Sequence, residues 1–256
     1  MRVCLFCSER ANSLEDAWPL WMVKQFRSQR PAEVRAERNG VALAPWKVYH
    51  PSMPIRCVCR ACNNGWMSRL ETDARPFIEP MLRGDRQKLD AAGQGITALW
   101  IVKTAMVMEA QDKQETRAYS DVERRQLSHL SAIPWRSAIW LSACADPSIF
   151  LATKTRHIGP ASGEFLGSST TMSFAHISMQ TLRMQVPESV GPTTNVTVAV
   201  RRGDWSEATL QIWPPRQTDV HWPPEKGLNG ELGLTLFADR FSTAGAAPTE
   251  VEALGV

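Results

Sequence analysis

Two Cys-x-x-Cys pairs constrain this chain more than any other feature of its sequence. The first pair is Cys4 and Cys7, and the second is Cys59 and Cys62. Each pair makes a tight turn that aims two sulfurs at one point about 2.3 Å away, so the four thiolates together complete the tetrahedral shell of Zn²⁺. Because the chain has only six cysteines, two matched pairs are a strong signal. We therefore predict one structural zinc ion.

The two other cysteines leave one alternative open. Cys57 precedes the second pair by two residues, so a ligand pair of Cys57 and Cys62 is also conceivable, although its spacing is looser than usual. We interpret Cys57 as a buried thiol in a strand, and Cys144 as a small core residue.

Bulk composition indicates a globular protein without a membrane segment. The 256 residues are 43% hydrophobic and 21% charged, which suits one or two folded domains. We found neither the run of about eighteen apolar residues that spans a bilayer nor a secretory leader. Because the cysteines are spaced for a metal rather than for disulfides, we expect a reducing, cytoplasmic location.

Charge is spread unevenly along the chain. Residues 1–90 contain fifteen Lys and Arg against ten Asp and Glu, a balance of +5, whereas the remainder contains fourteen against sixteen, a balance of −2. A basic N-terminal part suits contact with a polyanion, although a solvated surface gives the same number. Nucleic acid is the predicted partner.

Periodicity predicts helices in the first half of the chain. Amphipathic spacing indicates a helix from Pro19 to about Gln29, and a second helix begins at the second cysteine pair and runs to about Thr72. Pro76 and Pro80 are expected to divide the next segment into short pieces. A long helix comes after it, whose face is apolar except for one lysine: Ile96, Leu99, Trp100, Lys103, Met106, Val107 and Ala110. Ser120 and Glu123 form a capping box that starts another helix.

The chain becomes β-rich after about residue 135. A short strand is also expected earlier, at 41–48. Segments of β-branched or alternating residues, separated by turn residues, occur at 138–143, 148–153, 171–177, 180–186, 196–201, 208–213 and 232–237. The predicted fold is therefore α+β, with a treble-clef zinc domain at 1–90, a helical connector at 91–134, an antiparallel β-rich domain at 135–242 and a flexible tail at 243–256. The β-rich part is the candidate for a protein partner or self-association.

The first 85 or so residues resemble a zinc-containing branch of the HNH endonuclease family. The features that carry the resemblance are the first cysteine pair, the segment Ser13–Trp21, and the segment Cys59–Met67, which places a cysteine pair at a helix start. The resemblance implies a treble clef with a ββα-metal site that hydrolyses DNA phosphodiester bonds. Such a site uses a catalytic Mg²⁺ or Mn²⁺ in addition to the structural zinc.

The resemblance also assigns roles to individual residues. Glu15 corresponds to the acidic metal ligand, and Asn63 to a ligand or orienting residue on the helix. The sequence departs from the family at Asp16, where the family has a general-base histidine. Asp16 could join Glu15 at the metal, and His50 is the one histidine before the second cysteine pair that could replace the missing base.

Three interpretations of Glu15 and Asp16 remain open at this point. They are a metal-binding pair in an active endonuclease, a degenerate site retained for folding, or, with Ser13, simple helix N-caps. The functional prediction is accordingly an HNH-like DNA endonuclease. The alternative is a catalytically degenerate zinc protein that binds nucleic acid or a protein, and a third is a structural or assembly component.

Overall fold

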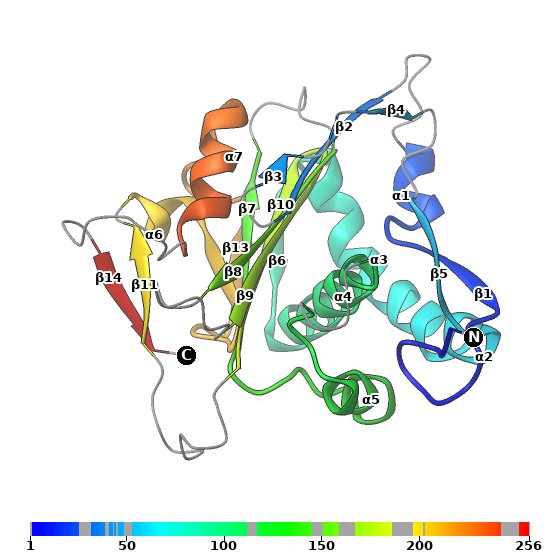
Figure 1. Cartoon of the computed structure of the whole chain (residues 1–256). Helices are drawn as coiled ribbons and strands as arrows, with labels where there is room; N and C mark the ends of the chain where they lie inside the picture. Colours follow the sequence, from blue (N-terminus) through cyan, green and yellow to red (C-terminus); the bar gives the residue numbers. More distant parts are fainter. Residues whose placement is uncertain are drawn as a thin grey trace.

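The computed structural model describes most of the chain. The described residues are 2–25, 32–38, 41–42, 44, 46–48, 53–111, 117–144, 151–158, 167–185, 197–201, 203–241 and 251–255. Helices and largely antiparallel sheets make up these ranges, so the predicted α+β class is confirmed (Figure 1). The predicted tail at 243–256 lies mostly outside them.

A small β-sheet and a helix join the two cysteine pairs. Strand β1 (Ser13–Asp16) pairs antiparallel with β5 (Pro54–Val58), and α1 (Leu20–Gln25) follows β1. A helical segment then begins directly after Cys59, with α2 (Arg60–Cys62), η1 (Asn63–Met67) and α3 (Ser68–Arg83). It is kinked inside η1 at Gly65, whose φ of −94° and ψ of −109° are not helical. The N-cap hypothesis is wrong, because Ser13 and Asp16 lie in β1 and α1 begins only at Leu20.

Helix α3 differs from the predicted short pieces because it passes through both prolines. Each proline removes a backbone N–H donor and disfavours a helix interior. In α3 this cost is offset by an apolar face that packs into the core, formed by Ala74, Ile78, Met81 and Leu82. The helix ends at Gly84, whose left-handed φ of 78° is a conformation that glycine adopts without strain.

An eight-stranded sheet forms the centre of the molecule. Its strands run in the order β12-β7-β10-β9-β8-β2-β3, with β4 also paired to β2, and all pairs are antiparallel except β2 with β8. Their bounds are β2 Ala32–Arg38, β3 Val41–Ala42, β4 Trp46–Val48, β7 Ser137–Ala143, β8 Leu151–Ile158, β9 Gly167–Phe174, β10 Ile177–Met184 and β12 Leu210–Trp213. The predicted strand at 41–48 is therefore two short strands.

Smaller elements complete the described structure. Strand β6 (Gln87–Leu89) pairs with β13 (Val220–Trp222), and β11 (Thr197–Arg201) pairs with β14 (Val251–Gly255). Helix α6 is Trp205–Ala208 and helix α5 is Asp121–Leu130. The predicted capping box of α5 is confirmed, because the Ser120 side chain accepts from the Glu123 N–H and the Glu123 carboxylate accepts from the Ser120 N–H.

One predicted strand is wrong. The segment 232–237 belongs to helix α7 (Gly230–Asp239), although its residues alternate as in a strand. In this helix and just after it, apolar residues follow helical spacing at Leu234, Phe237, Ala238 and Phe241, and all four are buried. Packing this stripe against the sheet decided between two patterns that the same residues satisfy.

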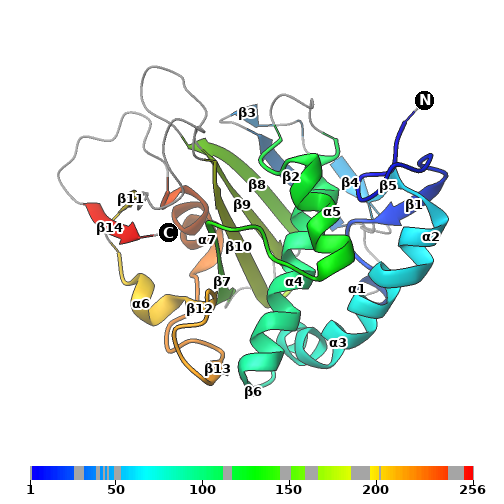
Figure 2. The same ribbon diagram turned by 90° about the horizontal axis from the view of Figure 1, so that it is seen from below.

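Two helices cover opposite faces of the central sheet. Helix α4 (Ala91–Glu109) lies on one face and α7 on the other, as Figures 1 and 2 show. Successive side chains of β9 point to opposite faces of the sheet, and those of Met172 and Phe174 enter the core on the α4 side. That larger core also takes in the region around the cysteine pairs, where the ring of Trp18 lies 5.1 Å from that of Phe174.

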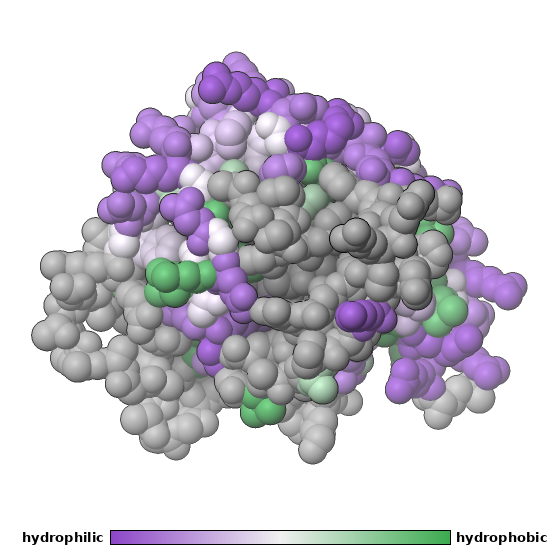
Figure 3. Space-filling view, turned by 90° about the horizontal axis from the view of Figure 1, so that it is seen from above, coloured by the Kyte–Doolittle hydropathy of each residue, from purple (hydrophilic) through white to green (hydrophobic). Residues whose placement is uncertain are grey.

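Helix α4 is long and apolar enough to cross a membrane by length and composition, the one such helix among the described residues. However, 72% of its most apolar window is buried inside the protein. Among the described residues, the face seen in Figure 3 is mostly hydrophilic, and its hydrophobic residues stand in small groups. The apolar character of α4 is explained by its place in the core.

The core does not follow the predicted divisions of the chain. One cluster of buried residues extends from Cys4 through Ile101 to Trp222. The domain bounds at 90, 134 and 242 nevertheless remain a prediction, because continuous packing does not test whether these parts fold separately.

Candidate metal centre and the adjoining cleft

The four predicted ligands come together at one point. One sulfur from each of Cys4, Cys7, Cys59 and Cys62 lies within 4.8 Å of the others. The Cys7 Sγ is 3.6 Å from the Cys59 Sγ and 3.7 Å from the Cys62 Sγ. A tetrahedron with Zn–S bonds of about 2.3 Å has edges of about 3.8 Å. The cluster is therefore positioned to hold a metal ion, and its all-sulfur donor set is consistent with structural zinc.

Backbone hydrogen bonds fix the first cysteine pair. The Cys4 N–H donates to the Glu9 carbonyl (2.7 Å), which closes the turn around the pair. The Leu5 N–H donates to the Cys57 carbonyl (2.8 Å), which attaches this turn to β5. The two pairs are thus aligned through β5, the strand that ends directly before Cys59.

The second pair is placed by the start of a helix. Cys59 is the N-cap of α2, and its sulfur accepts a hydrogen bond from the Cys62 N–H (3.4 Å). Burial opposes ionisation of Cys59, but this bond and those from neighbouring thiols together hold the pKa of Cys59 below its ordinary value. Burial raises the pKa of Cys7 to about 11 and also raises that of Cys62. Such a cluster requires a cation to hold four thiolates together.

Cys57 and Cys144 lie outside the cluster. Cys57 is buried in β5, where burial raises the pKa of its thiol to about 12, with the Glu15 carboxylate acting in the same direction. Cys144 is buried just after β7 and its N–H donates to the His176 carbonyl. Both interpretations as buried thiols agree with this placement.

Glu15 is held by a buried lysine. Its carboxylate is 3.1 Å from the Lys103 ammonium, and the Glu71 carboxylate is 3.0 Å from the same ammonium. Lys103 is 0% exposed, and the Glu15 side chain only 6%. Burial raises the pKa of Glu15 although Lys103 opposes this, and the two carboxylates raise the pKa of Lys103 against the effect of burial. Two carboxylates thus share one ammonium in the interior.

Of the other predicted catalytic residues, Asn63 forms its hydrogen bonds outside this group. The Asn63 side-chain amide donates to the Leu14 carbonyl (2.8 Å) and to the Ser13 hydroxyl (2.9 Å), so it ties the helix start to β1. Within the described ranges, Glu15 and Asn63 share no hydrogen-bond partner. Asp16 ends β1 opposite Pro54, and His50 lies outside the described residues.

Sequence reasoning missed Lys103 and Glu71 as members of a polar group. The available signal was Lys103, the only charged residue on the otherwise apolar face of the long helix. A charged residue on a core-facing stripe indicates a buried partner. It does not identify the partner, because Glu71 is 32 residues away and Glu15 is 88 residues away.

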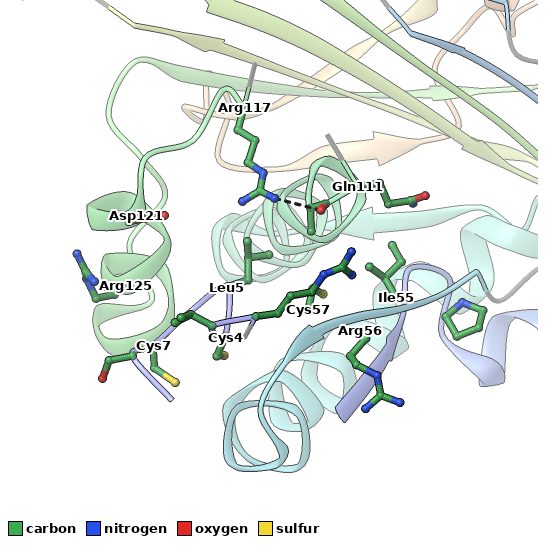
Figure 4. Close-up of a pocket in the computed structure, with 15 residues that line it drawn as sticks. Cys4, Leu5, Cys7, Ile55, Arg56, Cys57, Gln111, Arg117, Asp121 and Arg125 are labelled. Carbon is green, nitrogen blue, oxygen red and sulfur yellow. Dashed lines mark hydrogen bonds between the residues drawn. The ribbon is translucent and has the colours of Figure 1, made fainter. Parts of the chain in front are cut away.

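A cleft of about 950 Å³ adjoins the metal centre. Its walls are the first cysteine pair, β5, the end of α4 and the start of α5 (Figure 4). Leu5, Ile55 and Cys57 contribute apolar surface. Four arginines, Arg2, Arg56, Arg117 and Arg125, and one carboxylate, Asp121, are among the lining residues. A cleft whose charged lining residues are mostly cations suits an anionic ligand.

Comparisons with known proteins identify no relative. No family model, no curated protein and no solved structure matches the chain significantly.

Proposed function

We propose that this chain is a zinc-stabilised, HNH-like protein that binds nucleic acid without cleaving it through Glu15. The scaffold part of the proposal is supported by the order of its elements. A cysteine pair, strand β1, its partner strand β5 and a second cysteine pair at a helix start occur in this order, as in a treble clef, with α1 and β2 to β4 inserted between β1 and β5. The proposed zinc has a structural role, because four thiolates leave no open coordination position for a substrate.

The ion pair between Lys103 and Glu15 is the observation that supports binding without cleavage through Glu15. A catalytic Mg²⁺ or Mn²⁺ needs oxygen ligands that are free and reachable from solvent. Glu15 is buried and already paired with Lys103, and its neighbour Asp16 stands where the family has its histidine base. A divalent ion would have to displace a fully buried ammonium before it reached Glu15.

Binding of nucleic acid is supported by charge. The N-terminal part has a balance of +5, and the cleft beside the metal centre is lined by four arginines. Such features favour association with a polyanion through its phosphates. The endonuclease remains the competing proposal, since the resemblance that suggests the scaffold also suggests cleavage.

One experiment separates the two. Zinc-loaded protein is incubated with supercoiled plasmid and Mg²⁺ or Mn²⁺, beside Glu15→Gln and an EDTA control, while binding to short labelled DNA and RNA is followed by fluorescence anisotropy. We expect salt-sensitive binding and no nicking above the EDTA control. Nicking that disappears in Glu15→Gln would restore the endonuclease, whereas a wild-type protein that binds neither DNA nor RNA would end the nucleic-acid proposal.

A further inference from the structure

We propose that the cleft beside the metal centre is a binding site for phosphate esters, anchored by Arg2, Arg117 and Arg125. This cleft is the site at which the function proposed above would operate. The choice of nucleic acid as the source of the phosphates rests on that proposed function. The shared chemistry is a phosphoryl group held by guanidinium groups, and a free nucleotide is the other source.

The anchoring arginines come from three different segments. Arg2 precedes the first cysteine pair, Arg117 precedes α5, and Arg125 lies within α5. Arg56 also lines the cleft, but Figure 4 shows its side chain on the opposite side of β5 from Ile55, so we do not count it as an anchor. Tertiary packing alone brings the three anchors to one cleft.

These guanidinium groups retain donors for a ligand. Within the described part of the chain, neither Arg2 nor Arg125 forms an ion pair, and both are exposed. Arg117 uses one Nη2 donor on the Ala110 carbonyl (3.1 Å), and its buried Nε has no partner among the residues that the structure describes. A buried donor without a partner is costly, and a ligand acceptor would relieve that cost.

The carboxylate in the cleft is already engaged. Asp121 lies 3.0 Å from Arg124, a buried arginine that also contacts Glu109 at 2.7 Å. Asp121 therefore belongs to a second ion-pair group, and within the described ranges no carboxylate forms an ion pair with any of the three anchors.

The need to offset the negative charge of the metal centre does not explain why arginines line the cleft. Zinc with four thiolates carries two net negative charges, which neighbouring cations can offset. However, among the described residues no arginine of the cleft hydrogen-bonds to a sulfur of the cluster.

Phosphate is the anion that this arrangement favours. The planar guanidinium fork binds phosphate oxygens through two parallel charge-assisted hydrogen bonds. The volume of about 950 Å³ lies at the upper end of small-molecule pockets, about 300–1,000 Å³, so it admits a whole nucleotide or a short piece of backbone.

The test compares two double variants with the same change in charge. Arg2→Glu with Arg125→Glu alters the cleft, while Arg69→Glu with Arg86→Glu alters exposed arginines elsewhere. Zinc content and thermal unfolding first establish that each variant is folded. Binding of short single-stranded DNA and RNA is then measured, with ATP, inorganic triphosphate and a peptide rich in Asp and Glu tested separately.

We expect the cleft variant to bind oligonucleotides about 100-fold more weakly, because two charge-assisted hydrogen bonds to phosphate are lost. The slope of log K against log salt should also flatten by about 1.4, since each phosphate contact contributes about 0.7 for single strands. The matched control should stay within a few-fold of wild type.

The remaining outcomes separate this site from the proposed function. ATP binding that the cleft variant loses, without oligonucleotide binding, supports the site with a free nucleotide as its source and refutes the nucleic-acid function. Oligonucleotide binding that the cleft variant retains refutes the site and leaves the function standing. Variant-sensitive binding of the acidic peptide alone refutes the phosphate proposal, and a protein that binds none of these ligands refutes both.

Discussion

At the scale of single residues, spacing separates the cysteines that form the metal centre from those that do not. Cys57 is only two residues from Cys59, yet its side chain is buried in β5 and takes no part in the four-sulfur cluster. The reason is local geometry, because a Cys-x-x-Cys turn at a helix start directs both sulfurs to one side.

Replacing one cysteine at a time tests this assignment. We expect Cys59→Ser to lose most of the bound zinc and to lower the melting temperature, because a structural zinc site contributes directly to folding. Cys57→Ser should keep about one zinc per chain, and it serves as the matched control. Zinc is measured by mass spectrometry of the metal and unfolding by circular dichroism. Equal zinc loss in both variants would contradict the assignment.

At the scale of elements, a buried charge cluster joins the metal-binding region to the rest of the protein. Glu15 lies on β1, Glu71 on α3 and Lys103 on α4, so the cluster connects three elements. Asn63 adds a second connection, because its side chain links the start of the helical segment to β1. Residues that the resemblance marks as catalytic thus have structural contacts in this chain.

Removing the lysine should therefore destabilise the protein strongly. We expect Lys103→Met to lower the free energy of unfolding by about 3–5 kcal/mol at neutral pH, since it leaves two carboxylates without their buried counter-charge. Protonation relieves this, so the deficit should shrink at acidic pH. The double variant Lys103→Met with Glu15→Gln should recover part of the loss. Denaturant unfolding measures all three, and a loss of under about 1 kcal/mol that does not vary with pH would contradict the role of the cluster.

At the scale of the whole molecule, the core makes stability depend on pH. Burial raises the pKa of Glu109 to about 7 from an ordinary value of 4.5, although Arg124 and the Ala118 N–H oppose the shift. The folded chain therefore binds more protons than the unfolded chain between these values. The contribution of Glu109 to the free energy of unfolding is fully present at low pH and is lost as pH rises from about 4.5 to 7.

The variant Glu109→Gln should flatten this part of the stability curve. The expected result is a weaker decrease in the free energy of unfolding between pH 4.5 and 7, because the group that titrates in this window is gone. Replacement of the exposed Glu9 by Gln is the control and should leave the curve unchanged. Denaturant titrations across this range measure the slope, and a slope identical to wild type would refute the assignment to Glu109.

Sequence by itself determined the features that depend on neighbours along the chain. The Cys-x-x-Cys turns, the capping box of α5 and the long helix α4 each follow from residues a few positions apart, because their geometry is local. The positions of Cys4, Cys7, Cys59 and Cys62 were accordingly predicted in full.

Only the tertiary structure decided what distant residues do together. The segment 232–237 became a helix because its apolar stripe packs on the sheet, and α3 continued through two prolines because its apolar face is buried. Glu15 faces Lys103, 88 residues away, and the arginines of the cleft meet from separate segments. Burial and ion pairing act through space, so a residue's spacing in the chain does not reveal the partner that determines its role.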